Sequence, residues 1–237
     1  MKNTFPLLFC MCLPLLSFTQ TVYGTTGLVK TPTAYTLKSG EVAIGYVQFA
    51  DLFKKKYGDE SFRQWTAHAN IGFMSTFEAG IRVVGVPKVP VFDSNLPYEY
   101  YIDRIVNVKF AFLHERKILP QFAIGIQDAI GTRIFNATYL VASKKIAFSK
   151  VVACKLSLGY GTKLIEYIFD TPDNYRLLGF FGGVEVDMMH RVALMIEYDS
   201  KKINAGVRLN PRDWLNLYGY YTSMKDWGGG VSLKFNI

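Results

Sequence analysis

Side chains that could carry out catalysis are few in this sequence and are not paired. The histidines are His68, His114 and His190, and none has a second histidine or acid at the spacing that a zinc site requires. A serine hydrolase needs a serine, a base and an orienting group, but no serine accompanies His68 on its face of the predicted strand. Residues 228–230 are three glycines without the strand-to-helix context of a phosphate loop, and we interpret them as a hairpin turn. We therefore predict a protein that is not an enzyme and that uses no cofactor or metal ion.

Charged residues instead recur at alternate positions of the segments that we predict to be strands. They are Glu78, Arg82, Lys109, Lys155, Glu185, Asp187, Glu197, Asp199, Arg208 and Lys234. The set holds as many acids as bases, which favours internal ion pairs inside a small barrel over a wide selective channel.

The elements that must position these charges are β-strands, because the hydropathy pattern has a period of two. We count about twelve alternating segments, with approximate bounds 41–50, 63–74, 76–85, 103–113, 121–128, 135–145, 151–161, 178–188, 192–199, 202–209, 214–222 and 229–237. One face carries bulky apolar residues such as Val108 and Phe110, and the other carries small or polar residues such as Asn107 and Lys109. A soluble sandwich and a membrane barrel both produce this pattern.

Three features favour an antiparallel transmembrane β-barrel. The segments have the length of a tilted membrane-spanning strand. The gaps at 51–62, 86–102 and 162–177 are long while others are short, as expected of outer loops and periplasmic turns with both termini periplasmic. Aromatic residues gather at segment ends, where an interfacial girdle would lie; they are Tyr98, Tyr100, Tyr101, Trp214, Tyr220, Tyr221 and Trp227.

Residues 1–20 have the pattern of a cleaved secretory signal peptide. Lys2 precedes an apolar run from Phe5 to Phe18, and a polar exit follows. This predicts export and a location in the outer membrane. Residues 21–40 are too rich in proline and threonine for a central strand, so we expect a periplasmic lead-in or, preferably, a segment in the lumen. Residues 41–237 would then form the barrel.

The composition agrees with an exported folded protein. Half of the 237 residues are hydrophobic and 19% are charged, which excludes intrinsic disorder. The net charge of +8 is compatible with nucleic acid, anionic lipid or an acidic glycan. We expect no nucleic-acid partner, because the chain is exported and lacks a basic face.

Two stretches of sequence carry a more specific signal. One comprises residues 27–34, 39–42 and 45–46, and the other comprises residues 125–132, 135, 139–145 and 158–161. Both resemble the YjbH family of exopolysaccharide-associated outer-membrane proteins, whose members are often several times longer. The motif and lumenal residues that we single out are Pro32, Asp128, Gly131, Thr132, Tyr139, Ser143, Lys144, Arg82 and Glu78.

The resemblance implies an outer-membrane barrel with a non-catalytic role in exopolysaccharide production, export or surface assembly. Its expected partners are outer-membrane lipid and either the polysaccharide or the proteins that make or export it. From the residues themselves, Asp128, Gly131 and Thr132 predict a tight polar turn, and Lys144 and Lys145 predict a solvated strand end. The alternatives are a small-solute outer-membrane channel and a secreted, soluble β-sandwich that binds ligands.

Overall fold

The computed structural model describes residues 20–48, 64–87, 100–164, 176–223 and 226–237, and these residues form twelve antiparallel strands. The strands are β1 (Glu41–Gln48), β2 (Trp65–Phe73), β3 (Phe77–Pro87), β4 (Tyr100–Leu113), β5 (Gln121–Ile130), β6 (Ala137–Ala147), β7 (Val152–Thr162), β8 (Gly179–Met188), β9 (Val192–Tyr198), β10 (Ile203–Arg212), β11 (Leu215–Thr222) and β12 (Asp226–Asn236). Within these ranges there is no helix long and apolar enough to cross a membrane.

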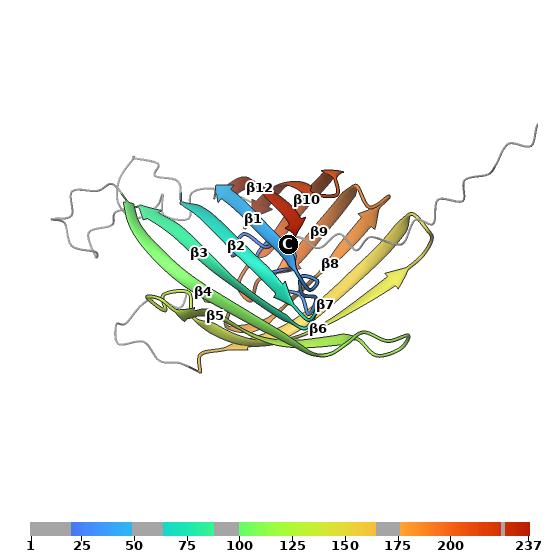
Figure 1. Ribbon diagram of the computed structural model, residues 1–237, viewed down its shortest axis with the longest axis horizontal. Coiled ribbons are helices and arrows are strands. Elements are labelled where there is room, and N and C mark those ends of the chain that lie inside the picture. The colour runs from blue at the N-terminus through green and yellow to red at the C-terminus, as the bar shows by residue number, and fades with distance from the viewer. Residues whose placement is uncertain (1–19, 49–63, 88–99, 165–175, 224–225) are drawn as a thin grey trace, which may run out of the picture.

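The sheet closes into a barrel in which each strand pairs with its neighbours in the chain and β1 pairs with β12 (Figure 1). The closing pair runs in register from Glu41 opposite Asn236 to Gln48 opposite Gly229. Closure leaves no free sheet edge, which is a requirement for a sheet that spans a membrane. The predicted antiparallel transmembrane barrel of about twelve strands is confirmed, and the β-sandwich alternative is wrong because one sheet closes on itself.

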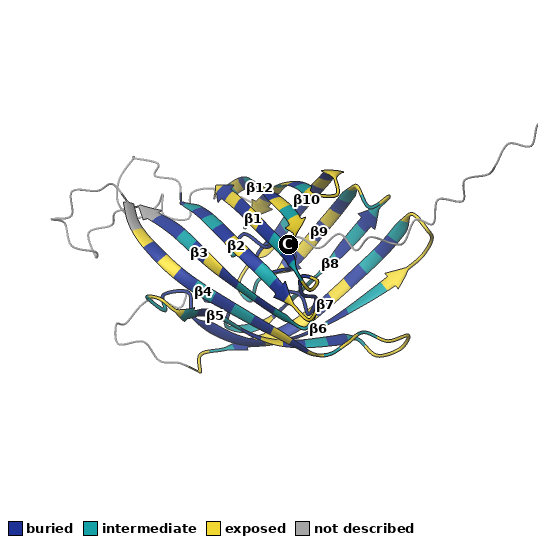
Figure 2. Ribbon diagram, viewed as in Figure 1, coloured by how far each residue is buried: buried dark blue, intermediate teal, exposed yellow. Residues whose placement is uncertain are grey.

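Burial alternates along every strand, so that Figure 2 shows stripes of buried and exposed residues. Large apolar side chains face outward; Ile81 is 60% exposed and Leu158 is 64% exposed. Buried charged residues such as Glu78 and Arg208 face inward. This is the reverse of a soluble protein, in which large apolar side chains fill the interior and charges face water.

The two rims of the barrel differ. The terminal rim contains Gly40 and Ile237, which are joined by a backbone hydrogen bond of 3.0 Å from the Ile237 N–H to the Gly40 carbonyl. The opposite rim, called the loop rim here, is where β1, β3 and β7 end and the long gaps begin. The short turns between β2 and β3 and between β8 and β9 lie at the terminal rim, because antiparallel strands alternate in direction.

Two sequence predictions about local structure are wrong. Residues 228–230 lie within β12 and pair with β11, so they form no hairpin turn. Tyr220 is buried and its hydroxyl donates a hydrogen bond of 3.3 Å to the Gln48 carbonyl, so it points inward and belongs to no girdle. Trp214, Tyr221 and Trp227 are exposed, as a girdle requires. Tyr98 and residues 1–19 of the predicted signal peptide, which the sequence places at 1–20, lie outside the described residues.

Candidate functional site

The lumen of the barrel is occupied by the chain that precedes β1. Residues 20–38, called the plug here, run as a coil between the strands, as Figure 1 shows in blue. Almost all of the plug is buried, and Val22, Ala34 and Leu37 have no exposed surface. The plug therefore supplies apolar side chains to the interior, because the strands direct most of their large apolar side chains outward.

The plug is a coil because its sequence opposes extended pairing. Its regular structure is limited to two isolated bridges, Gln20 with Thr26 and Gly27 with Pro32. Pro32 lacks an N–H, and Gly24 has a φ of 91°, which favours glycine. A Cβ on Gly27 would lie 2.3 Å from the Thr31 carbonyl oxygen, so this tight reversal requires glycine.

Glu78 of β3 binds the plug at two points, Thr26 and Leu37. Its carboxylate accepts hydrogen bonds from the Thr26 N–H at 2.8 Å, the Thr26 hydroxyl at 2.6 Å and the Leu37 N–H at 3.1 Å. Lys109, directly opposite on β4, forms an ion pair of 3.5 Å with Glu78 and donates to the Thr26 carbonyl at 2.9 Å. The pair thus satisfies plug backbone groups that a coil cannot satisfy within itself.

Glu197 of β9 holds the middle of the plug. It accepts hydrogen bonds from three consecutive backbone N–H groups, those of Val29 at 3.0 Å, Lys30 at 2.9 Å and Thr31 at 3.1 Å. The Thr31 hydroxyl and the Asn204 amide each donate to the same carboxylate at 2.9 Å. Such charge-assisted bonds are stronger than those between neutral groups.

A second ion-pair network lies beside the plug. Glu185 of β8 pairs with Lys155 of β7 at 2.7 Å and with Arg208 of β10 at 2.8 Å. Arg208 also donates to the Gly27 carbonyl at 3.4 Å. The predicted internal ion pairs are therefore confirmed for these residues and for Glu78 with Lys109.

Arg82 joins the plug to the connection between β5 and β6. Its guanidinium lies between two rings, 4.9 Å from the centroid of Tyr23 and 4.7 Å from that of Phe135. Asn107 of β4 donates to the Tyr23 carbonyl at 2.9 Å. A desolvated cation between two aromatic faces is a favourable arrangement, so Arg82 fixes Tyr23 in the lumen.

The residues of the predicted turn lie at the end of β5. Asp128 is buried and falls within the strand, whereas Gly131 and Thr132 lie in the connection to β6. Asp128 has a φ of 52° and accepts a hydrogen bond of 3.0 Å from the Phe135 N–H, while its own N–H donates to Asn107 at 3.0 Å. Thr132 donates to Asp103 at 2.6 Å, and Gly131 has a φ of 145°. These motif residues shape the connection that carries Phe135 to Arg82.

Tyr139 and Ser143 of β6 face the lumen as well. Tyr139 packs edge-on against Phe181, with ring centroids 6.1 Å apart. Ser143 accepts a hydrogen bond of 2.8 Å from the Ala34 N–H and lies 2.8 Å from the Ser157 hydroxyl. Pro32, Tyr139 and Ser143 are thus packing or anchoring residues of the plugged lumen.

The prediction for Lys144 and Lys145 is wrong, because both lie within β6 rather than at a solvated end. Lys144 forms an ion pair of 3.1 Å with Glu115 and donates to the Arg116 carbonyl. The backbone N–H of Lys145 donates to the same Glu115 carboxylate at 2.9 Å.

Several residues of the site escaped the sequence analysis. Glu41 and Asp103 face inward on the same alternation that identified the other lumenal charges. Glu41 accepts from the Lys38 N–H at 3.0 Å and pairs with Lys234 at 3.5 Å. Glu115 lies in a connection, where no periodicity could mark it.

Glu115 links the terminal rim to the plug through Tyr35. The Tyr35 hydroxyl donates to the Glu115 carboxylate at 2.8 Å. Burial, and then this hydrogen bond, raise the pKa of Tyr35 well above its ordinary value, so the phenol stays protonated. The Tyr35 hydroxyl thus remains a hydrogen-bond donor to Glu115 at the terminal rim.

Among the described residues, no cluster of three or more His, Cys, Asp or Glu side chains could hold a metal ion. His68 faces the lumen as predicted, but it is buried rather than solvated, and the structure gives neither ring nitrogen a hydrogen-bond partner.

Solved structures with a similar fold are outer-membrane porins. The KdgM porin in complex with disordered oligogalacturonate aligns with a TM-score of 0.50 and 10% identity, covering 82% of this chain and 99% of the porin. The KdgM porin alone aligns over the same shares with a TM-score of 0.49 and 10% identity. At this identity the likeness concerns the fold.

Sequence comparisons identify the family. A relative from Escherichia coli (strain K12), named "Uncharacterized lipoprotein YjbH", is 29% identical over 130 residues. The match spans 53% of this chain but only 16% of the relative. The profile of the YjbH family, described as "Exopolysaccharide biosynthesis protein YbjH", matches residues 19–237. The chain, a closed barrel with a plugged lumen, therefore belongs to the YjbH family of exopolysaccharide biosynthesis proteins.

Proposed function

We propose that this protein is a plugged outer-membrane barrel with a non-catalytic role in the production, export or surface assembly of an exopolysaccharide. Its family membership supports the link to exopolysaccharide, and its outward apolar surface supports a place in the membrane. The proposed partners are the polysaccharide itself or the proteins that make or export it.

The observation that carries this proposal is the way the plug is held. Glu78 and Glu197 together accept hydrogen bonds from five backbone N–H groups and two hydroxyl groups of the plug. These groups belong to five plug residues, because Thr26 and Thr31 each donate through both their N–H and their hydroxyl. Buried carboxylates in such an arrangement favour a closed lumen over a continuous water-filled path. A closed barrel fits a scaffold for surface assembly, or a passage that opens when a partner displaces the plug.

A gene deletion tests the role in exopolysaccharide. Deletion should lower extracellular polymer, and complementation with the wild-type gene should restore it. A variant with Glu78→Gln and Glu197→Gln weakens the plug anchors but keeps the strands. A change in extracellular polymer in this variant is therefore caused by the plug and not by loss of the barrel. Unaltered matrix sugar and surface polymer in the deletion strain would refute the role.

A small-solute channel is the second candidate, and conductance distinguishes it. Wild-type protein in a planar bilayer should show no steady unit conductance if the plug closes the lumen. Regular single-channel steps from the wild-type protein would instead favour passage of small solutes.

A further inference from the structure

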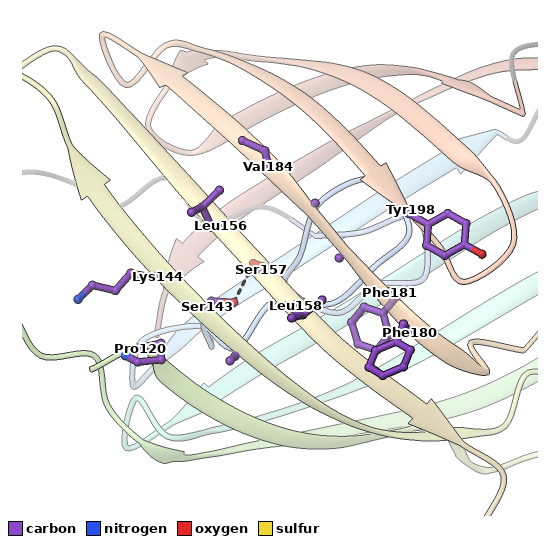
Figure 3. A pocket seen from close by; sticks show the side chains of 13 residues that line it. Pro120, Ser143, Lys144, Leu156, Ser157, Leu158, Phe180, Phe181, Val184 and Tyr198 are labelled. Atoms are coloured by element: carbon purple, nitrogen blue, oxygen red, sulfur yellow. Dashed lines mark hydrogen bonds between the residues drawn. The ribbon is translucent and has the colours of Figure 1, made fainter. Parts of the chain in front are cut away.

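The outer wall of the barrel carries an apolar groove of about 480 Å³ over β6, β7 and β8 (Figure 3). Ala142 of β6 and Gly182 of β8 occupy outward positions, and Leu158 of β7 stands between them in the register. Their small size makes the floor low in a wall that otherwise projects large side chains. The walls are formed by Leu156, Phe180, Val184 and Tyr198.

One end of this groove is cationic. Figure 3 shows Lys144 and Pro120 at one end and Tyr198 at the opposite end. Lys144 lies beside the connection between β4 and β5, which carries the exposed residues Arg116 and Lys117 at the terminal rim. This end therefore holds three cations and one carboxylate, Glu115, which forms an ion pair with Lys144 and accepts hydrogen bonds from Tyr35 and Lys145.

Apolar residues flank these cations at the same rim. Ile118 is 86% exposed in the connection between β4 and β5, and Phe148 is 71% exposed just after β6. Apolar side chains among basic ones are typical of a surface that enters the headgroup region of a membrane.

We propose that the groove and its cationic end bind one anionic phospholipid of the membrane leaflet at the terminal rim. An acyl chain lies in the groove over Ala142 and Gly182, and the phosphate lies near Arg116, Lys117 and Lys144. The charge complementarity identifies the ligand class, because a neutral headgroup would gain little from three cations. This site is on the lipid side of the wall, so the proposal does not depend on the role in exopolysaccharide.

Lipid retention by the full-length protein tests the proposal. Protein purified in a non-ionic detergent is mixed with phosphatidylglycerol or phosphatidylcholine, and retained lipid is counted by native mass spectrometry. We expect phosphatidylglycerol to be retained preferentially. Arg116→Gln combined with Lys117→Gln should lower its retention at least about fivefold, and Ala142→Leu should lower retention by filling the floor.

Matched controls lie elsewhere on the same barrel. Lys163→Gln removes an exposed cation beyond the end of β7 at the loop rim, and Ala69→Leu enlarges an exposed outward alanine on β2. Neither should change retention. The Arg116 and Lys117 variant alters only exposed side chains, so it remains informative even if Ala142→Leu does not fold.

Three outcomes would overturn the proposal. The first is equal retention of the two phospholipids, and the second is an equal loss of retained lipid in the test and control variants. The third is binding of a second copy of the chain in place of lipid. A change in polymer output without a change in lipid retention would concern the proposed function alone.

Discussion

The carboxylate of Glu197 accepts hydrogen bonds from both the backbone N–H and the hydroxyl of Thr31, which precedes it by 166 residues in the chain. The N–H bond measures 3.1 Å and the hydroxyl bond 2.9 Å. Here a strand side chain accepts the backbone N–H hydrogen bonds that the backbone of a neighbouring strand accepts in a sheet. The plug is therefore part of the folded barrel and not an appended tail.

Replacing this carboxylate should loosen the plug. Glu197→Gln removes the charge and one acceptor, leaving buried N–H groups of residues 29–31 without full partners. We expect a loss of about 1–3 kcal/mol in the free energy of unfolding, measured by thermal or denaturant titration in detergent. Asp213→Asn is the control, because Asp213 pairs with Arg191 at an exposed site, and it should have almost no effect. Equal stability of wild type and Glu197→Gln would contradict the anchoring role.

Trypsin should distinguish the two lysines of the plug. Lys30 is buried and its ammonium donates to Thr222 at 2.8 Å, whereas Lys38 is exposed. In the folded protein we expect cleavage after Lys38 to precede cleavage after Lys30, which should require heating. Mass spectrometry of the fragments gives the order. Rapid cleavage after Lys30 in unheated protein would show that the plug leaves the lumen.

Gly27→Ala should disturb the plug while sparing the barrel. The added Cβ would lie 2.3 Å from the Thr31 carbonyl oxygen and 2.4 Å from Cγ2 of Thr21, so the reversal must open. We expect an unchanged strand content by circular dichroism and faster cleavage after Lys30. Gly219→Ala is the matched control, since its Cβ would meet only the Gly228 carbonyl oxygen at 4.0 Å. Faster cleavage in both variants would refute a local effect at Gly27.

The buried network around Glu185 should respond unequally to substitution. Glu185→Leu leaves Lys155 and Arg208 together without their shared carboxylate, and we expect a loss of about 3–5 kcal/mol. Lys155→Met should cost less, because Arg208 still pairs with Glu185 at 2.8 Å. Denaturant titration of the two variants gives the comparison. A larger loss for Lys155→Met would mean that Arg208 does not compensate Glu185.

Heat-dependent gel migration tests the membrane barrel directly. The folded protein should remain in the outer-membrane fraction and migrate faster unheated than boiled, because a closed barrel with a hydrogen-bonded wall resists unfolding by detergent. Amino-terminal sequencing of the same band tests removal of residues 1–20. A soluble protein without a shift on boiling would contradict the assignment to the membrane.

Much of the strand architecture could be predicted because alternation is a local property. Each segment bound lies within a few residues of the observed strand, and the predicted 151–161 is observed as β7 at Val152–Thr162. The same alternation placed Glu78, Lys109 and Glu185 on the inner face. Nearness to a strand end suggests a girdle position for Tyr220, but the alternation places Tyr220 on the inner face, and the alternation is the better guide.

The sequence could not predict contacts between residues of non-adjacent segments. Glu185 meets Lys155 on the adjacent strand, a pairing set by register, but Arg208 reaches it across β9. Arg82 lies between Tyr23 and Phe135, which come from the plug and from a connection. No periodicity relates such residues.

The sequence by itself predicted about twelve strands, their inner and outer faces and a resemblance to the family, because side-chain alternation and local motifs follow the order of residues along the chain. For residues 21–40 the sequence left a periplasmic lead-in and a lumenal segment open, with a preference for the lumen. The tertiary structure decided that residues 20–38 fill the lumen and that Glu78 and Glu197 hold them. The physical reason is that a coil has no repeating pattern of its own. Its place is set by buried donors that must find acceptors, and those acceptors come together only when β1 closes on β12.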